Sequence, residues 1–248
     1  MSVDVTWLIQ KLASPKMCYE GCCRLQPWIM VVCLLTLTLG LVDGLFFAPP
    51  DYQQGDVYRI MFLHVPAAIL SLGIYIVMTV AVIMYFIWKI KVADIIAKVS
   101  APLGAMFTLI TLITGALWGK PTWGTFWIWD ARLTSELILL FIYFGMIALR
   151  SAIPEPVLAA RASGVMTLVG MVNIPIVHYS VLWWNTLHQG ATILKLGMPS
   201  ISPHMLVPLL LMIVAYVFYY LWMLCIKIRY ELLVREKKAH WVKELKQC

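Results

Sequence analysis

Six stretches of the chain, each about as long as a bilayer is thick, consist almost entirely of apolar residues. A membrane-spanning helix needs roughly 20 such residues, because each residue adds about 1.5 Å to its length. The sequence therefore predicts an all-α integral membrane protein with six transmembrane helices. The expected spans are about residues 28–48, 60–88, 99–118, 131–149, 162–184 and 205–226.

These apolar segments run nearly the length of the 248-residue chain, so we expect a single membrane domain, residues 1–248, and no soluble one. Charged residues make up only 12% of the chain, whereas soluble domains usually have about 25%. The N-terminal sequence MSVDVTWLIQK lacks the basic start and apolar core of a cleaved signal peptide. We therefore expect the first span to be retained.

Basic residues are distributed unevenly between the two sides of the predicted membrane domain. An even number of spans places both termini on one side, and that side holds 15 of the 19 Lys and Arg residues. The positive-inside rule then predicts that both termini are cytoplasmic and that the loop at residues 118–130 faces outward. The outer side holds Arg59, Lys120, Arg132 and Lys195.

The net charge of +7 comes mainly from the C-terminal tail, Lys227 to Lys246, and needs no nucleic acid to explain it. We expect this tail to lie on anionic membrane lipid, with contact to a cytoplasmic partner as the alternative. The cysteine-rich segment CYEGCC has no paired CxxC and no nearby histidine. We therefore expect reduced thiols there and no metal site.

The outer loop contains the tryptophan-rich segment WGTFWIWD, residues 123–130, with Trp118 just upstream. A fourth span that began only after Glu136 would be too short for the bilayer, so it must begin near Ala131, with Asp130 as its N-cap. Arg132 and Glu136 then lie one turn apart at the outer edge of the membrane. Either they form a local ion pair, or Arg132 is directed at an anionic ligand.

Two histidines are expected at the membrane level of this loop. His64 lies at the outer end of the second span, and His188 follows the fifth. Two imidazoles can occupy both axial positions of a haem iron. His178, deeper in the fifth span, is a third candidate for which we expect a helix-packing role, and His204 is a further alternative.

The tryptophans themselves suggest a surface for a flat apolar ligand. Trp127 and Trp129 share a face if the segment is extended, and Trp123 and Trp127 share one if it is helical. Either arrangement predicts a layer of indole rings on which a macrocycle would bury apolar area. The alternative is an ordinary interfacial belt, which is what we expect of Trp183 and Trp184.

The run WGTFWIWDARLTSEL closely resembles the tryptophan-rich WWD signature of the haem-handling membrane proteins of cytochrome c maturation. The chain length, six spans and outer histidines are similar to those of the cytochrome c maturation protein C family, from about Trp28 to Lys227. The resemblance implies that haem b is held transiently, as cargo, with His64 and His188 as axial ligands of the iron. It also assigns further cofactor-binding positions, which are the motif residues Trp118, Trp123, Trp127, Trp129 and Asp130 and the propionate-facing Arg59 and Arg132. The chain departs from the family pattern at Phe126, where the family usually has tryptophan.

The same resemblance implies a location and partners. It predicts a protein of the bacterial inner membrane that binds haem at the periplasmic face and presents it to a periplasmic haem chaperone during c-type cytochrome biogenesis. Implied partners are an ABC-type ATPase, its membrane subunit and a small single-span accessory protein. The chain has no phosphate-binding loop of its own, so ATP hydrolysis would belong to another subunit.

We do not expect the chain to be an enzyme, although whether it catalyses the haem–chaperone bond is left open. The alternative function is a permease subunit that moves haem or another small molecule through its own spans. Transporters often use broken helices near the bilayer centre. Asn173 with Pro175 is the main candidate for such a break.

Overall fold

The computed structural model describes residues 14–190 and 201–245, and this part of the chain is almost entirely helical. It contains six candidate membrane spans that are long and apolar enough to cross a bilayer, which confirms the predicted fold class. The α-helices are α2 (Pro15–Val42), α3 (Met61–Trp88), α4 (Lys91–Trp123), α5 (Ala131–Ala152), α6 (Pro156–Gly170), α7 (Asn173–Trp183), α8 (Pro203–Arg235) and the short α9 (His240–Leu245).

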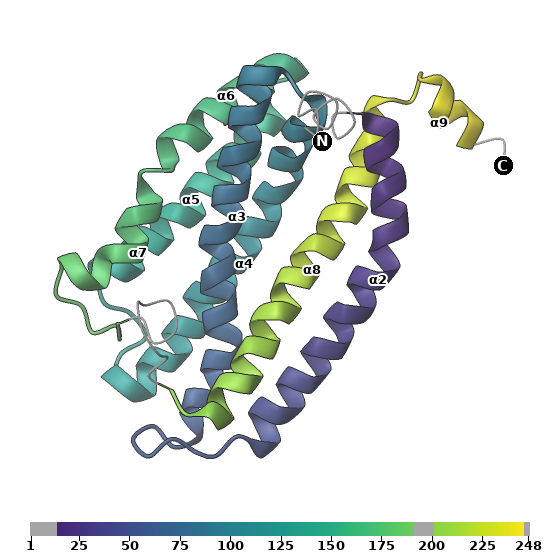
Figure 1. The fold of residues 1–248 in the computed structure, drawn as a ribbon. Helices are drawn as coiled ribbons and strands as arrows, with labels where there is room; N and C mark the ends of the chain where they lie inside the picture. Colours follow the sequence, from purple (N-terminus) through teal and green to yellow (C-terminus); the bar gives the residue numbers. More distant parts are fainter. Residues whose placement is uncertain (1–13, 191–200, 246–248) are drawn as a thin grey trace, which may run out of the picture.

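The long helices form an up-and-down bundle in which most sequence neighbours lie side by side (Figure 1). The N-terminal helix α2 packs mainly along α8, and α8 joins this pair to α3 and α4. The start of α2 and the end of α8 lie at one end of the bundle. The connections at 48–55, 124–130 and 184–190 lie at the opposite end (Figure 1). This second end holds the predicted site residues.

Several helices extend beyond the apolar spans expected from the sequence. Helix α2 begins at Pro15 and α8 ends at Arg235, because backbone hydrogen bonds within a helix continue past its apolar residues. Helix α4 likewise runs on to Trp123. Trp118 and Trp123, which the sequence analysis placed in the outer loop, therefore lie on a helix, and the irregular segment begins at Gly124.

The fifth candidate span is broken between α6 and α7, at Met171 and Val172. Pro175 has no N–H to bond the carbonyl of Met171, so the helix cannot continue regularly across this point. The Asn173 side chain is buried and donates its Nδ2 hydrogen to the Ser135 carbonyl, 2.9 Å away on α5. The span is therefore broken just before Asn173 and Pro175, the candidate for a break named from the sequence.

Candidate functional site

The predicted histidine pair lies around a cavity of about 80 Å³ at the end of the bundle opposite the start of α2. The cavity lies between the start of α3, the end of α4, the start of α5 and the segment after α7. It is lined by Gln54, His64, Gly115, Trp118, Thr122, Trp123, Leu133, His188 and Gln189. The structure therefore brings together four of the site residues predicted from the sequence, which are His64, His188, Trp118 and Trp123.

His64 lies in the first turn of α3 and is buried against α4, with 6% of its surface exposed. Its ring rests directly on the backbone of α4 at Gly115. A Cβ added to this glycine would lie 3.1 Å from His64 Cε1, closer than nearly all real contacts of this kind. A glycine at this position therefore lets the imidazole approach the helix.

The Thr114 hydroxyl fixes the orientation of the His64 ring. Thr114 Oγ1 lies 3.0 Å from His64 Nδ1 and donates its own hydrogen to the Ile110 carbonyl, at 2.6 Å. Because that hydrogen is already used, the hydroxyl accepts from Nδ1–H. The lone pair of the neutral ring then lies on Nε2, the nitrogen available to a metal.

His188 follows α7, and its ring lies near that of His64, with centroids 6.2 Å apart and planes inclined by 33°. Its Nδ1 lies 3.2 Å from the Gln189 carbonyl, which can only accept, so Nε2 again carries the lone pair. Burial lowers the pKa of His188 from its ordinary value, and the positive charge of Arg132 lowers it further. Both effects favour the neutral imidazole that metal binding requires.

The end of α4 lines the cavity with two tryptophans, Trp118 and Trp123. Residues 115, 118 and 122 recur at helical spacing and all line the cavity. The Trp118 ring meets His64 edge-on at 5.7 Å, and its Nε1 donates to Gln54 Oε1 at 2.7 Å. Trp123 lies 6.0 Å from the His188 ring. Each histidine is therefore paired with one tryptophan of α4.

The loop after α4 holds the remaining tryptophans of the motif. Gly124, with φ +82°, ends the helix in a left-handed conformation that suits glycine. Trp127 is partly buried against the core, and its Nε1 has no partner among the described residues. Trp129 is 77% exposed. The two rings meet edge-on, at 5.4 Å and 77°, so they do not form the flat indole layer expected from the sequence.

Asp130 caps α5, as predicted: its Oδ1 accepts from the Leu133 N–H at 2.8 Å. Its other oxygen, Oδ2, is buried without a partner in the described part of the chain. The cap therefore ties the end of the tryptophan loop to the start of α5.

Arg132 and Glu136 form no ion pair, so the simple local neutralisation considered from the sequence is wrong. Arg132 Nη1 donates to the Val177 carbonyl at 2.7 Å and links α5 to α7. Glu136 is buried, and its Oε1 has no partner among the described residues. Among the described residues, no carboxylate lies within ion-pair distance of Arg132, so its charge remains available to an anion near His188.

Arg59 is not among the residues that line the cavity. Its guanidinium donates to the carbonyls of Gly44 and Ala48, at 2.5 and 2.9 Å, and to Asp56 Oδ1 at 2.9 Å. These bonds fasten the end of α2 to the start of α3. In this arrangement Arg59 organises the connection between α2 and α3.

Other candidates from the sequence lie away from the cavity. His178 and His204 are exposed, so His178 does not pack between helices as expected. Trp183 and Trp184 are exposed as well. Phe126 is 54% exposed, and the Lys120 ammonium lies 5.4 Å from the centre of its ring. The aromatic position that departs from the family pattern is therefore on the outside of the loop.

Several residues that support the histidine pair were not predicted from the sequence. Thr114 and Gly115 lie one helical turn before Trp118. Because α4 continues to Trp123, this helical spacing could have indicated that they are near the site. Gln54 and Gln189 offered none, because they lie in irregular segments that only the fold brings to the cavity.

The helix bundle and this cavity define a multi-pass membrane protein with a paired-histidine, tryptophan-lined site at one end. The profile of the family described as heme exporter protein C matches residues 8–243. The chain belongs to this family.

Individual relatives agree over nearly the full chain. The heme exporter protein C of Haemophilus influenzae is 48% identical over 97% of this chain and 98% of its own length. That of Escherichia coli K12 is 48% identical over 96% of both chains. A putative cytochrome c biosynthesis ccmC-like mitochondrial protein of Marchantia polymorpha is 42% identical over 79% of this chain and 84% of its own.

Proposed function

We propose that this protein binds haem between His64 and His188 and presents it at the periplasmic face of the bacterial inner membrane to a haem chaperone. The spacing of the two imidazole rings, which line one cavity, carries the proposal. Imidazole nitrogens bind first-row metals at about 2 Å. Two rings on opposite sides of one ion therefore have centroids about 6 Å apart, close to the 6.2 Å observed.

The composition of the site favours a metal that arrives with ligands of its own. Within the described residues, no group of three or more His, Cys, Asp or Glu side chains gathers where it could hold a metal ion. Two histidines alone are a poor cage for a free ion. They suit haem iron, which needs only two axial ligands because the porphyrin supplies the rest.

The cavity is too small to enclose the macrocycle. Its volume of about 80 Å³ equals roughly three water molecules at about 30 Å³ each. It holds the two imidazoles, so the porphyrin must lie between side chains that move apart at its mouth. Trp123 lies at the end of α4 and His188 lies in the irregular segment after α7, where such movement disturbs the bundle least. Arg132 pairs with no carboxylate in the described part of the chain and would attract a haem propionate.

In this proposal the chain delivers haem and does not catalyse its attachment. The names of its relatives support haem export, and the family resemblance supports an ABC-type ATPase, its membrane subunit and a small single-span protein as partners. The distribution of basic residues supports an outer position for the site and a cytoplasmic position for the end of the bundle with the start of α2.

The absorption spectrum of the protein purified in detergent and supplied with haem tests this function. We expect a six-coordinate, bis-imidazole spectrum that changes to five-coordinate in His64→Ala and in His188→Ala. His178→Ala, which changes an exposed histidine, serves as the control and should keep the wild-type spectrum. An unchanged spectrum in both site variants would refute the ligand assignment.

The broken fifth span supports a second candidate, a permease for haem or another small molecule. Broken helices are common at transport sites. Here, however, Asn173 bonds to α5 and does not line the histidine cavity. It also does not line a second cavity, which lies beside Arg150 at the other end of the bundle. Haem flux into proteoliposomes that contain only this chain would favour the permease. Haem binding without flux would favour delivery.

A further inference from the structure

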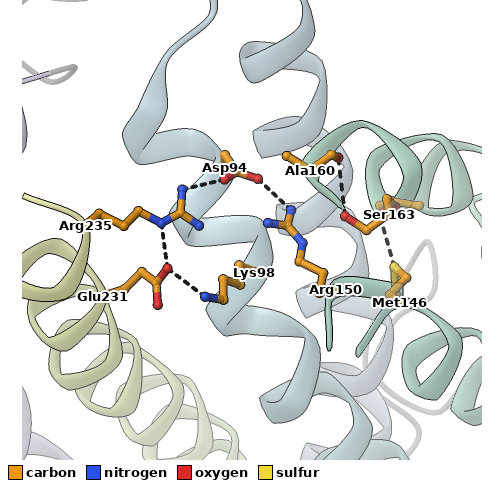
Figure 2. A network of polar contacts seen from close by, with 9 residues as sticks. Asp94, Lys98, Met146, Arg150, Ala160, Ser163, Glu231 and Arg235 are labelled. Carbon is orange, nitrogen blue, oxygen red and sulfur yellow. Dashed lines mark hydrogen bonds and ion pairs between the residues drawn. The ribbon is translucent and has the colours of Figure 1, made fainter. Parts of the chain in front are cut away.

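Five charged side chains form a network at the end of the bundle opposite the histidine pair (Figure 2). Asp94 on α4 accepts from Arg150 on α5 at 2.6 Å and from Arg235 on α8 at 2.7 Å, one guanidinium to each oxygen. Glu231 Oε1 accepts from Arg235 at 2.6 Å and from Lys98 at 2.7 Å. The network therefore ties together α4, α5 and α8, which belong to three different candidate membrane spans.

The network has more positive than negative charges. Three basic groups share the two carboxylates, and both carboxylates are largely buried, with side chains 5% and 9% exposed. Arg150 uses only Nη2 for an acceptor among the described residues, so its other N–H groups have none there. Its side chain is 12% exposed. A guanidinium with unused donors in such a position favours an anion beside it.

A cavity of about 290 Å³ lies beside this cluster, between α3, α4, α5 and α6. It is separate from the histidine site. Its lining consists of Met78, Ala97, Lys98, Ala101, Pro102, Met146, Ile147, Arg150, Ser151, Ser163 and Thr167. The volume corresponds to roughly ten water molecules, and it is near the lower limit of small-ligand sites, about 300 Å³.

The lining changes from basic to apolar with depth. Arg150 lies in the last turn of α5 and Lys98 in the second turn of α4, near the helix ends. Met78 lies ten residues before the end of α3, and is therefore about 15 Å from that end along the helix axis. The hydroxyls of Ser163 and Thr167 already donate to backbone carbonyls of α6. The spare donors are therefore at the end of the cavity near the membrane surface.

We propose that this cavity binds the phosphate of an anionic phospholipid through Arg150 and Lys98, with the start of an acyl chain against Met78 and Met146. Basic pockets between transmembrane helices are known to take anionic lipid headgroups. The excess positive charge requires an anion, and the apolar inner wall requires an amphiphile. Free phosphate satisfies the first requirement only. Because lipid bound here contacts α3 to α6 together, it stabilises the bundle independently of haem.

Native mass spectrometry of the full-length protein, delipidated in mild detergent and titrated with phosphatidylglycerol, tests the proposal. We expect one tightly bound phosphatidylglycerol per wild-type chain and much weaker binding of phosphatidylcholine. Lys98→Gln removes one cation and should weaken phosphatidylglycerol binding roughly fivefold. Ala101→Phe fills the cavity without changing any charge and should abolish this binding.

Lys91→Gln is the matched control, since Lys91 is on the same helix, is 76% exposed and does not line the cavity. It should bind phosphatidylglycerol like the wild type. Thermal unfolding in lipid-free detergent checks that each variant is folded, and Lys98→Gln tests the site even if Ala101→Phe does not fold. Equal binding of the two lipids, or equal binding by Lys98→Gln and wild type, would overturn the proposal. Inorganic phosphate that raises the unfolding temperature as much as phosphatidylglycerol would overturn the lipid assignment.

Discussion

The imidazole rings of His64 and His188 lie with their centroids 6.2 Å apart, although they belong to the second span and to the segment after the fifth. Each ring is held through Nδ1, by the Thr114 hydroxyl in one case and by the Gln189 carbonyl in the other. This leaves both Nε2 atoms as acceptors. The arrangement leads to five predictions, some of which concern residues outside the tryptophan-rich motif.

Thr114→Val should weaken haem binding about 10- to 100-fold, as losses of hydrogen bonds to metal-binding histidines usually do. Valine has nearly the same shape as threonine but cannot accept from His64 Nδ1–H, so the ring loses its fixed tautomer. Haem titration followed by absorption measures the effect. Thr114→Ser keeps the hydroxyl and should bind haem like the wild type; similar affinities for Val and Ser variants would contradict the role of the hydroxyl.

Gly115→Ala should displace the His64 ring, because the added Cβ would lie 3.1 Å from Cε1. We expect lower haem occupancy and a weakened six-coordinate spectrum after purification. Gly73→Ala on α3 is the control, since a Cβ there meets no atom within 4 Å. Equal haem occupancy in the two variants would show that the close contact with α4 is unimportant.

Replacing Trp127 and Trp129 together by alanine should lower haem occupancy more than replacing Trp183 and Trp184. The first pair lies in the loop that joins α4, which lines the cavity, to the capped start of α5, whereas the second lies at the end of α7. Pyridine haemochrome assay of equal amounts of folded protein gives the comparison. Equal losses would indicate that all four tryptophans act only as a membrane-interface belt.

Asp130→Ala should destabilise the protein by about 1 kcal/mol through loss of the α5 cap, and it should also lower haem occupancy because it loosens the tryptophan loop. Asp130→Asn keeps a capping oxygen and should restore most of the stability. Glu155 caps α6 at the other end of the bundle. Glu155→Ala should therefore lower the unfolding temperature similarly without loss of haem, and a parallel haem loss there would point to general destabilisation.

In haem-free protein, His188 should still be neutral when the pH falls to about 6.5, the ordinary pKa of histidine. Burial and the charge of Arg132 both disfavour the imidazolium, so the pKa of His188 lies below that value. Removing the positive charge in Arg132→Gln should move the pKa upward. NMR titration of histidine-labelled protein in detergent measures both values, and a His188 pKa at or above 6.5 in the wild type would contradict the structure.

Some features of this protein are determined by local sequence. Apolar segments of bilayer length determined the six spans, and the shortness of the fourth span placed Asp130 as its cap. Pro175 likewise determined where the fifth span breaks. Each of these follows from interactions among residues that are close in the chain, so no knowledge of the neighbouring helices was needed.

The site required the tertiary structure. Membrane helices are apolar on most faces, so the sequence pattern does not indicate which face meets which neighbour. The rotation and packing of α4 alone direct Trp118 to Gln54 and place Thr114 and Gly115 against His64. The same packing directs Arg132 to α7 and uses Arg59 within the connection between α2 and α3. Sequence thus determined which residues lie at the level of the site, and only packing between distant segments decided which of them meet.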